Sequence, residues 1–508
     1  MELELNRTHL SGYDAVLDAT ILHEETMEMI VPDACPDILR IVDTAGTVCL
    51  KSKEAQEGRA EVSGTVRCSV LYLPDGESGL RRIEANLPFH CTADAARLVP
   101  GCIIVASPRI QAAETRSLNP RKVLVRVNLA LMLRGWAPAA KALATGAVCP
   151  QDGGVEQLKE QHNAYMVTCV QEKPFTFSDD LVISGSRPAA EEILKASVNL
   201  ICNESKIIGS KLIFKGEADL RVCYRGAGGA ICTVDYELPF SQIMEVIGVE
   251  EEADCALEVI LTDLNCALAS EDGRTISVAL GLLAQATIRE ERSVELLADL
   301  YSTACVLTPE RKSHTLRRLV ERNLRRQTAR EAVETGMTAA STVDAAVTVC
   351  QVTQTGEGVH RTFSADTVLT VLYLSEENEP YSVCRQITVP CQVDLPEEAE
   401  CFCGCKCVGE VFATPAGGSI EVRFDLEYQY LALASTEVSA VSGVQTGEAP
   451  PRTPGSQPSI VLRMVSGERL WDLAKAYNTT MATIMRANDL DREEPLGGKM
   501  LLIPKKRA

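Results

Sequence analysis

Aromatic residues are scarce in this 508-residue chain: phenylalanine, tryptophan and tyrosine together make up 4%, and the two tryptophans are Trp136 and Trp471. Since sugars commonly stack on exposed rings, this scarcity mildly disfavours carbohydrate binding. Basic residues are also in the minority, because 50 Lys and Arg face 70 Asp and Glu, for a net charge of −20. An acidic chain repels phosphate, so we expect no nucleic-acid partner.

Long hydrophobic runs are missing as well. The most apolar stretch, residues 278–288, is interrupted by Gly281 and Gln285, and a transmembrane helix needs about 20 apolar residues. The N-terminus, MELELNRTHLSGYDAV, has no basic region followed by an apolar one, so it does not resemble a secretory signal. We therefore expect a cytoplasmic protein without a transmembrane segment, whose 20 cysteines are mostly reduced thiols.

Recognisable catalytic motifs are absent too. The six histidines form no H-E-x-x-H pair, and no G-x-S-x-G sequence occurs. Gly498-Lys499 is followed by Met500, which does not fit a phosphate-binding loop. His90 adjoins Cys91 but lacks spaced partners for a metal. The sequence thus favours a protein that is not an enzyme and carries no cofactor.

One cysteine cluster, in the segment CFCGCKC, could carry chemistry. Its members are Cys401, Cys403, Cys405 and Cys407. On a strand the four thiols would share one face, about 6.6–7 Å apart, too far for an unstrained disulfide. The spacing also differs from that of a structural zinc site. We expect reduced, partly buried strand residues; a metal site with a turn at Gly404 and oxidative cross-linking stay open as alternatives.

A repeat of about 151 residues runs through most of the chain. Its markers are three tyrosines, Tyr72, Tyr224 and Tyr373, spaced 152 and 149, and three prolines, Pro88, Pro239 and Pro390, spaced 151. The tyrosines end the β-prone segments 64–73, 216–224 and 365–374, and further such segments begin at Val123, Thr275 and Ser419. The repeat therefore predicts three tandem β-rich domains, sandwich-like or partly open barrels.

Alternation within the repeat indicates which residues are buried. Val66, Cys68, Val70 and Tyr72 would share one strand face, so we interpret the recurring tyrosines as core residues. The recurring prolines cannot donate to a sheet, which predicts strand starts or edge strands for them.

Two segments have helical character. Residues 189–195 follow Ser186 and Pro188, which would suit a helix start. Residues 309–334 hold eight Lys and Arg against four Glu, with an approximate apolar face. This basic segment could bind RNA, a membrane surface or an acidic patch on the same protein; we favour self-contact or a solvated linker, because the rest of the chain is acidic. The predicted fold is thus mainly β with connecting helices.

The C-terminus differs in composition. Residues 441–458 are rich in proline and glycine and should form a flexible linker. Residues 459–506 follow a strand–helix–helix–strand pattern, which predicts a small βααβ module. Residues 459–508 hold nine Lys and Arg and six Asp and Glu, a charge of +3, so the remaining 458 residues carry −23. The module would suit an acidic partner surface, including the body of the protein itself.

The module resembles a LysM domain. The resemblance rests on the motifs VSGE from Val465, LWDLA from Leu470, YNTT from Tyr477, AN at Ala487 and LLIP from Leu501. Glu468-Arg469 replaces the Asp-Thr pair usual in the family, which predicts a weaker cap for the first helix. The resemblance implies binding of N-acetylglucosamine glycans such as peptidoglycan, in a groove between two loops. The groove residues that it implies are Gly467, Glu468, Arg469, Leu470, Asp489, Leu490, Asp491 and Leu496.

The remainder of the chain resembles the SPOCS domain family. The resemblance rests on E-x-M-x-M-I-V-P-D-x-x-P-D-I from Glu25, on the strand from Gly64 to Tyr72, and on the L-P-F segment. Three such repeats followed by one LysM module resemble SipL-type spore-coat morphogenetic proteins. The third repeat is the most divergent, since Ala365 replaces the glycine and Val389-Pro390-Cys391 replaces Leu-Pro-Phe. The expected domains are residues 1–155, 156–300, 301–440, a linker at 441–458, and the module at 459–506.

The resemblance implies a function in assembly. Proteins of this type act in the mother-cell cytoplasm at the forespore surface, where the LysM module engages a coat-basement ATPase, stage IV sporulation protein A. We therefore expect a non-enzymatic scaffold of spore-coat assembly that recruits this protein partner. The alternative is a peptidoglycan-binding protein of the cell wall or spore cortex. The missing export signal favours the scaffold.

Overall fold

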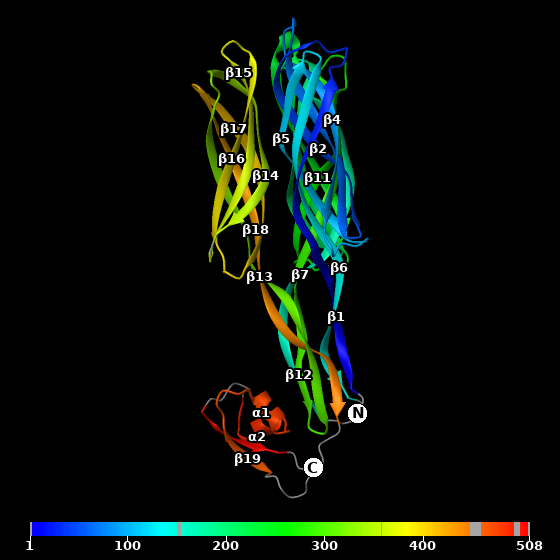
Figure 1. Ribbon diagram of the computed structural model, residues 1–508, viewed down its shortest axis with the longest axis vertical. Coiled ribbons are helices and arrows are strands. Elements are labelled where there is room, and N and C mark those ends of the chain that lie inside the picture. The colour runs from blue at the N-terminus through cyan, green and yellow to red at the C-terminus, as the bar shows by residue number, and fades with distance from the viewer. Residues whose placement is uncertain (1–2, 150–153, 357, 448–458, 492–497, 506–508) are drawn as a thin grey trace.

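The computed structural model describes residues 3–149, 154–356, 358–447, 459–491 and 498–505. Within these ranges the chain is mainly β, with twenty strands, two short α-helices and one 3-10 turn at Ala227–Gly229. Figure 1 shows an elongated molecule whose small C-terminal module lies at one end. Eighteen of the strands form three consecutive units of six strands each.

The three units have the following strands. Unit 1 contains β1 (Glu4–Ile30), β2 (Ile38–Gln56), β3 (Arg59–Pro74), β4 (Arg81–Asp94), β5 (Ile103–Asn119) and β6 (Lys122–Val148). Unit 2 contains β7 (Val155–Val182), β8 (Ala190–Ile208), β9 (Lys211–Gly226), β10 (Ile231–Glu245), β11 (Asp254–Leu268) and β12 (Thr275–Ser302). Unit 3 contains β13 (Val306–Glu334), β14 (Ala339–Thr355), β15 (His360–Ser375), β16 (Pro380–Asp394), β17 (Glu400–Ala416) and β18 (Ser419–Gly447).

Strand pairing is the same in all three units. The second, third and fourth strands form an antiparallel meander, and the sixth strand pairs with the first and the fifth. The apolar faces of these two sheets pack together; in unit 1, for example, Val66 and Val70 share a core with Val125 and Val127. Tyr13 pairs with Val167, which joins β1 to β7 and makes one six-stranded sheet from units 1 and 2.

The recurring tyrosines and prolines lie where the sequence predicts them. Tyr72, Tyr224 and Tyr373 are buried. Each hydroxyl donates to a backbone carbonyl that precedes it by 36 to 38 residues: that of Pro36 at 3.2 Å, Pro188 at 3.0 Å and Thr335 at 3.3 Å. Each buried phenol thus finds its acceptor in the segment just before the first meander strand of the same unit. The prolines lie in β4, β10 and β16, each an edge strand of its meander.

Equivalent residues of the three units meet at one point. Asp43, Lys195 and Asp344 each precede the recurring tyrosine by 29 residues and each follows a β-bulge. Lys195 Nζ lies 3.1 Å from Asp43 Oδ2 and 2.7 Å from Asp344 Oδ2. All three are buried. The apolar residues around this charged triad also come from all three units: Val42, Leu71, Leu80, Leu194, Cys223 and Leu372.

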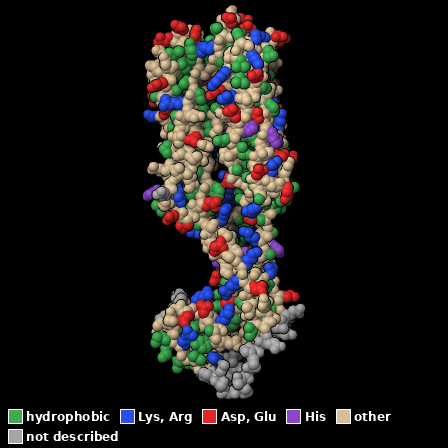
Figure 2. All heavy atoms as spheres, viewed as in Figure 1, with side chains coloured by type: hydrophobic (Ala, Val, Ile, Leu, Met, Phe, Trp, Pro, Cys, Tyr) green, Lys and Arg blue, Asp and Glu red, His purple; other side chains and the backbone are tan. Residues whose placement is uncertain are grey.

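The three units continue downward into a shared stem. Their first and last strands are longer than the other strands and extend as three two-stranded ribbons below the sandwiches (Figure 1). Figure 2 shows how the molecule narrows there. The stem interior draws on all three ribbons: Leu143, Ala144, Ala147, Ala164, Val294, Leu296, Leu297, Leu300, Leu307, Leu316, Val438, Ala440 and Val441.

The helix predicted at residues 309–334 is wrong, because the segment is strand β13 and pairs with β18 throughout. Lys, Arg and Glu favour helices in isolation, but the long strand β18 supplies a partner that outweighs this preference. β13 is an edge strand, where charged side chains protect a free edge. The interpretation of self-contact is confirmed: Arg317 pairs with Glu400 at 3.0 Å, and Arg322 pairs with Asp254.

The helix predicted at residues 189–195 is wrong as well, because it is the start of β8. Bulges occur after Ala190 and after Ile193. A bulge sets two residues against one and interrupts the alternation of a strand, so Ile193, Leu194 and Lys195 are buried consecutively. The predicted linker differs too: residues 441–447 belong to β18, and residues 448–458 lie outside the described ranges.

Candidate functional site

The C-terminal module contains β19 (Ile460–Met464), α1 (Leu470–Ala476), α2 (Met481–Ala487) and β20 (Met500–Pro504). β19 and β20 pair antiparallel, with Leu462 opposite Leu502. Their inner side and the two helices enclose a small core formed by Val465, Leu470, Trp471, Leu473, Ala474, Ile484, Leu501 and Ile503. The module thus buries its own hydrophobic centre despite its size.

The helix starts of the module differ in their caps. Thr480 caps α2, since its hydroxyl accepts from the Thr483 backbone at 3.1 Å. At α1 the cap position is Arg469, whose side chain makes no capping bond. The weaker cap that the sequence predicted for α1 is therefore confirmed.

Asn488, at the end of α2, holds strand β20. Its side-chain amide donates to the Leu502 carbonyl at 2.7 Å and accepts from the Leu502 N–H at 2.8 Å. It thereby satisfies backbone groups that a neighbouring strand would otherwise bind. We infer that this amide closes the outer edge of the two-stranded sheet.

The predicted groove residues do not form one exposed surface. Leu470 is buried, and Leu490 packs half-buried against the same core. Glu468 binds Arg463 and accepts from the Ser466 N–H at 2.9 Å. Gly467, Arg469, Asp489 and Asp491 are exposed, and Leu496 lies outside the described residues.

The module docks on the end of the stem through Asp299, a buried carboxylate of β12. Trp471 Nε1 donates to Asp299 Oδ2 at 2.8 Å, and Lys475 Nζ lies 2.8 Å from both carboxylate oxygens. Arg311 of β13 completes the set at 2.9 Å. One carboxylate therefore joins two stem strands to helix α1.

Tyr301, two residues further along β12, supplies the apolar part of the contact. Its ring packs edge-on against Trp471 with 4.9 Å between centroids, and its hydroxyl donates to the Thr479 carbonyl at 2.7 Å. Asn478 donates to the Thr303 carbonyl at 3.2 Å. Trp471 is consequently buried and is not an exposed sugar-stacking ring.

The charge of Asp299 depends on these contacts. Burial disfavours its ionised form, but the bonds from Lys475, Trp471 and Arg311 outweigh burial, so the pKa of Asp299 lies below its ordinary value. Asp299 therefore stabilises the docked module fully above the ordinary aspartate pKa. This stabilisation is lost as the pH falls through the lowered pKa of Asp299.

We expect Asp299→Asn to release the module from the stem while the three units stay folded. The amide is neutral and keeps one acceptor oxygen of the two, so it cannot replace the carboxylate that holds Trp471, Lys475 and Arg311. In a Trp136→Phe background, Trp471 is the sole tryptophan, so release should shift its fluorescence emission to the red. Asp472→Asn is the matched control, because Asp472 is an exposed residue of α1 that pairs with Arg469. An unshifted spectrum in Asp299→Asn would contradict the docking role.

Sequence reasoning missed Asp299 and Tyr301. The segment Leu296-Leu297-Ala298-Asp299-Leu300-Tyr301 contains one charge in an otherwise apolar run. Because charged residues are rarely fully buried unless paired, that lone acid was the available signal. Its partners in the module, Trp471 and Lys475, are more than 170 residues away and were not visible in the sequence.

The cysteine cluster lies on β17, and the four thiols are free. They face tyrosines, alanine and leucine on β18: Cys403 pairs with Tyr430 and Cys405 with Tyr428. Burial raises the pKa of Cys403 and Cys405 to about 12 and that of Cys407 to about 11. The prediction of partly buried strand residues is confirmed. No group of three or more metal-ligating side chains occurs among the described residues.

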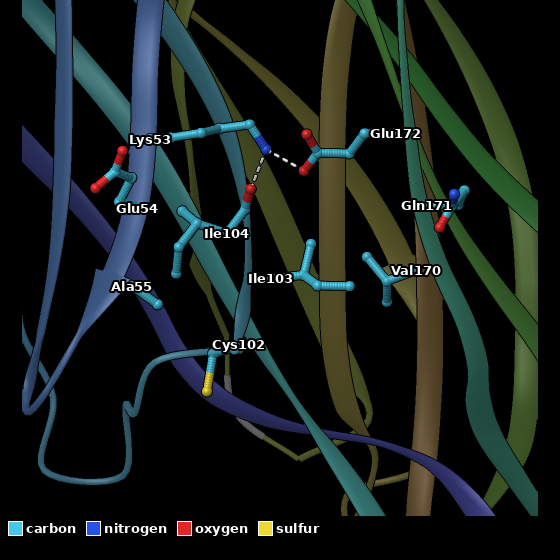
Figure 3. Close-up of a pocket in the computed structure, with 10 residues that line it drawn as sticks. Lys53, Glu54, Ala55, Cys102, Ile103, Ile104, Val170, Gln171 and Glu172 are labelled. Atoms are coloured by element: carbon cyan, nitrogen blue, oxygen red, sulfur yellow. Dashed lines mark hydrogen bonds and ion pairs between the residues drawn. The ribbon is translucent and has the colours of Figure 1, made fainter.

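A depression of about 450 Å³ lies between units 1 and 2 (Figure 3). Lys53 points across it to Glu172 and to the Ile104 carbonyl. Burial lowers the pKa of Lys53, with Glu172 acting in the opposite direction. Because the ammonium is already held by a carboxylate and a carbonyl, we interpret this contact as a link between the two units.

Comparison with known families is consistent with this architecture. The model of the SipL SPOCS domain family matches residues 37–116 and 189–269, within units 1 and 2. The LysM domain model matches residues 465–504. No curated protein and no solved structure gives a match.

Neither domain family is a family of enzymes, and none of the described helices has the length and apolar character to cross a membrane. SPOCS and LysM domains in one chain indicate a protein associated with sporulation, and LysM domains suggest glycan binding. The order of these matches along the chain, two SPOCS regions followed by a LysM domain, supports a SipL-type protein.

Proposed function

We propose that this protein is a non-enzymatic scaffold of spore-coat assembly. It acts in the mother-cell cytoplasm at the forespore surface and recruits a protein partner, stage IV sporulation protein A, through its LysM module. Unit 3 is the third, divergent SPOCS domain, because its six strands pair in the same order as those of units 1 and 2.

The observation that carries this proposal is the docked module. Trp471 and Tyr477 are the aromatic residues of the module. Trp471 is buried against Tyr301, and Tyr477 lies between Arg463 and Lys505. A glycan-binding site that relies on ring stacking has little to use here, whereas a module fixed to a long stem suits the display of a protein-binding surface.

Binding of purified stage IV sporulation protein A tests the proposal. We expect the full chain to bind it and a chain that lacks residues 459–508 to lose at least ten-fold in affinity, measured by biolayer interferometry. In the truncated chain the three units should keep their melting temperature, except for a decrease due to the lost contact between the module and Asp299. Undiminished binding by the truncated chain would refute recruitment through the module.

The LysM match itself favours a second candidate, binding of peptidoglycan. Co-sedimentation with purified peptidoglycan distinguishes the two functions. Under our proposal the chain stays in the supernatant, as an unrelated acidic protein would, and deletion of residues 459–508 changes nothing. Retention that depends on these residues would assign the module to glycans instead.

A further inference from the structure

The outer face of the module's two-stranded sheet is apolar and exposed. Ile460, Leu462 and Met464 of β19 are 53%, 65% and 65% exposed, and Met500 and Leu502 of β20 are 66% and 39% exposed. Leu462 lies opposite Leu502 and Met464 opposite Met500, so these side chains form one continuous surface. We call these five residues the outer strand face.

Exposed large hydrophobic side chains are concentrated on the outer strand face. The outer strand face holds five of the twenty large hydrophobic residues that are exposed in the described part of the chain, although β19 and β20 have five residues each. The alternate residues Val461, Leu501 and Ile503 point to the helices and pack in the module core. Contiguous apolar patches rimmed by polar residues commonly mark interaction sites.

The stem contact leaves this face free. The module docks through α1 and the segment after it, on the side of the sheet opposite the outer strand face. In Figure 1, β19 lies at the end of the module away from the sandwiches, and Figure 2 shows hydrophobic side chains gathered at the lower left of the module. The long stem therefore presents the apolar face at one end of the molecule.

We propose that the outer strand face is the docking surface for the protein partner, and that the partner contributes an apolar patch bordered by carboxylates. This inference rests on the proposed function and specifies which surface performs it. Lys499 and Lys505 flank β20, and the module carries +3. A partner with acidic residues around its apolar patch complements both features.

A second copy of this chain fits less well. At strand spacing the face measures about 17 Å by 10 Å, or about 170 Å². This area is far below the roughly 800 Å² that each partner buries in a standard interface. Two modules packed face to face would also bring like charges together. A larger acidic partner can contact the basic flanks as well, which a symmetric pair of these faces cannot.

A membrane surface also fits less well. Proteins that lie on membranes commonly use aromatic side chains as anchors at the interface, and the outer strand face has none. Methionine and leucine instead adapt to an apolar protein surface, and methionine is over-represented at such binding sites.

The test uses the full chain with Leu462→Glu, and purified stage IV sporulation protein A as the probe. We expect binding to weaken at least ten-fold, because the substitution removes an apolar contact and places a carboxylate against the acidic rim. Leu462→Lys should weaken binding less than Leu462→Glu. Leu22→Glu is the matched control, since Leu22 in β1 is 62% exposed but lies in unit 1; its binding should equal that of the unmodified chain.

The outcomes separate this inference from the proposed function. If the unmodified chain fails to bind the probe, both are refuted. If deletion of residues 459–508 abolishes binding but Leu462→Glu leaves it unchanged, recruitment stands and the outer strand face is wrong. Sedimentation with anionic vesicles or a concentration-dependent dimer, either abolished by Leu462→Glu, would assign the face to lipid or to a second copy and overturn the proposal. Unchanged thermal melting shows that the variant is folded.

Discussion

Replacing Lys195 by methionine is expected to lower the free energy of unfolding of the three units by about 3–5 kcal/mol. This is the range found when one partner of a buried ion pair is removed. Methionine fills nearly the same volume, but Asp43 and Asp344 are left buried without their shared cation. Urea unfolding followed by circular dichroism measures the effect. Lys215→Met is the control: Lys215 pairs with Glu204 at the surface, and such pairs contribute at most about 1 kcal/mol.

The pH dependence of the stability of Lys195→Met tests the same ion pairs independently. Burial favours neutral Lys195, yet Asp43 and Asp344 raise its pKa above the ordinary value. Burial likewise opposes ionisation of Asp344, but Lys195 and Arg221 lower its pKa. The stabilisation that Lys195 contributes is thus fully present below the ordinary lysine pKa. It is lost as the pH rises through the raised pKa of Lys195 in the folded protein. The stabilisation that Asp344 contributes is present above the ordinary aspartate pKa. It is lost as the pH falls through the lowered pKa of Asp344 in the folded protein.

In Lys195→Met the Asp344 carboxylate loses this support, so it should take up a proton at a higher pH than in the unmodified protein. The stability deficit should therefore be largest near neutral pH and should shrink as the pH falls towards about 4. A deficit that is small, or independent of pH over this range, would mean that the charged triad does not hold the units together.

Gly216→Ala is expected to cost about 1–3 kcal/mol or more, since overpacking a tight core is destabilising. A Cβ at Gly216 would lie 2.2 Å from the Ile201 carbonyl oxygen and 2.6 Å from the Phe240 ring. Gly64 has the same surroundings in unit 1, where Phe89 covers it. Thermal melting of the full chain measures the cost.

Gly404→Ala provides the control for this substitution. Gly404 also lies in a strand, but nothing is within 4 Å of a Cβ built there, so stability should change by less than about 0.5 kcal/mol. In unit 3 the equivalent position already carries a Cβ: Ala365 lies opposite Val389. Equal melting temperatures for Gly216→Ala and Gly404→Ala would contradict this account of the glycines.

The repeat made the main features of the fold predictable. Tyr72 and its equivalents, the edge prolines and the β class all follow from alternation and spacing, which depend on local geometry. The charged triad follows from the same repeat only when the units are compared at a fixed offset from the tyrosines. Lys195 differs from the two aspartates Asp43 and Asp344, so a search for a residue type shared by all three repeats passes over this position.

Other features depend on contacts that no local pattern encodes. Residues 309–334 favour a helix on composition, and only the length of β18 makes them a strand. At the module, the sequence predicted the elements and the cap at Arg469. It assigned Leu470 to a groove, although the turn of the helix carries this side chain inward. The stem partner of Trp471 required the three-dimensional arrangement.

The charged triad has a consequence for how such a protein can be encoded. In an assembly of three identical chains, one residue type would occupy all three equivalent positions, and three aspartates or three lysines would repel one another at close range. A single gene that carries three diverged copies can instead place one lysine between two aspartates. Divergence of the copies is then part of the design: exchanging unit 2 for a second unit 1 would bury three carboxylates with no lysine among them.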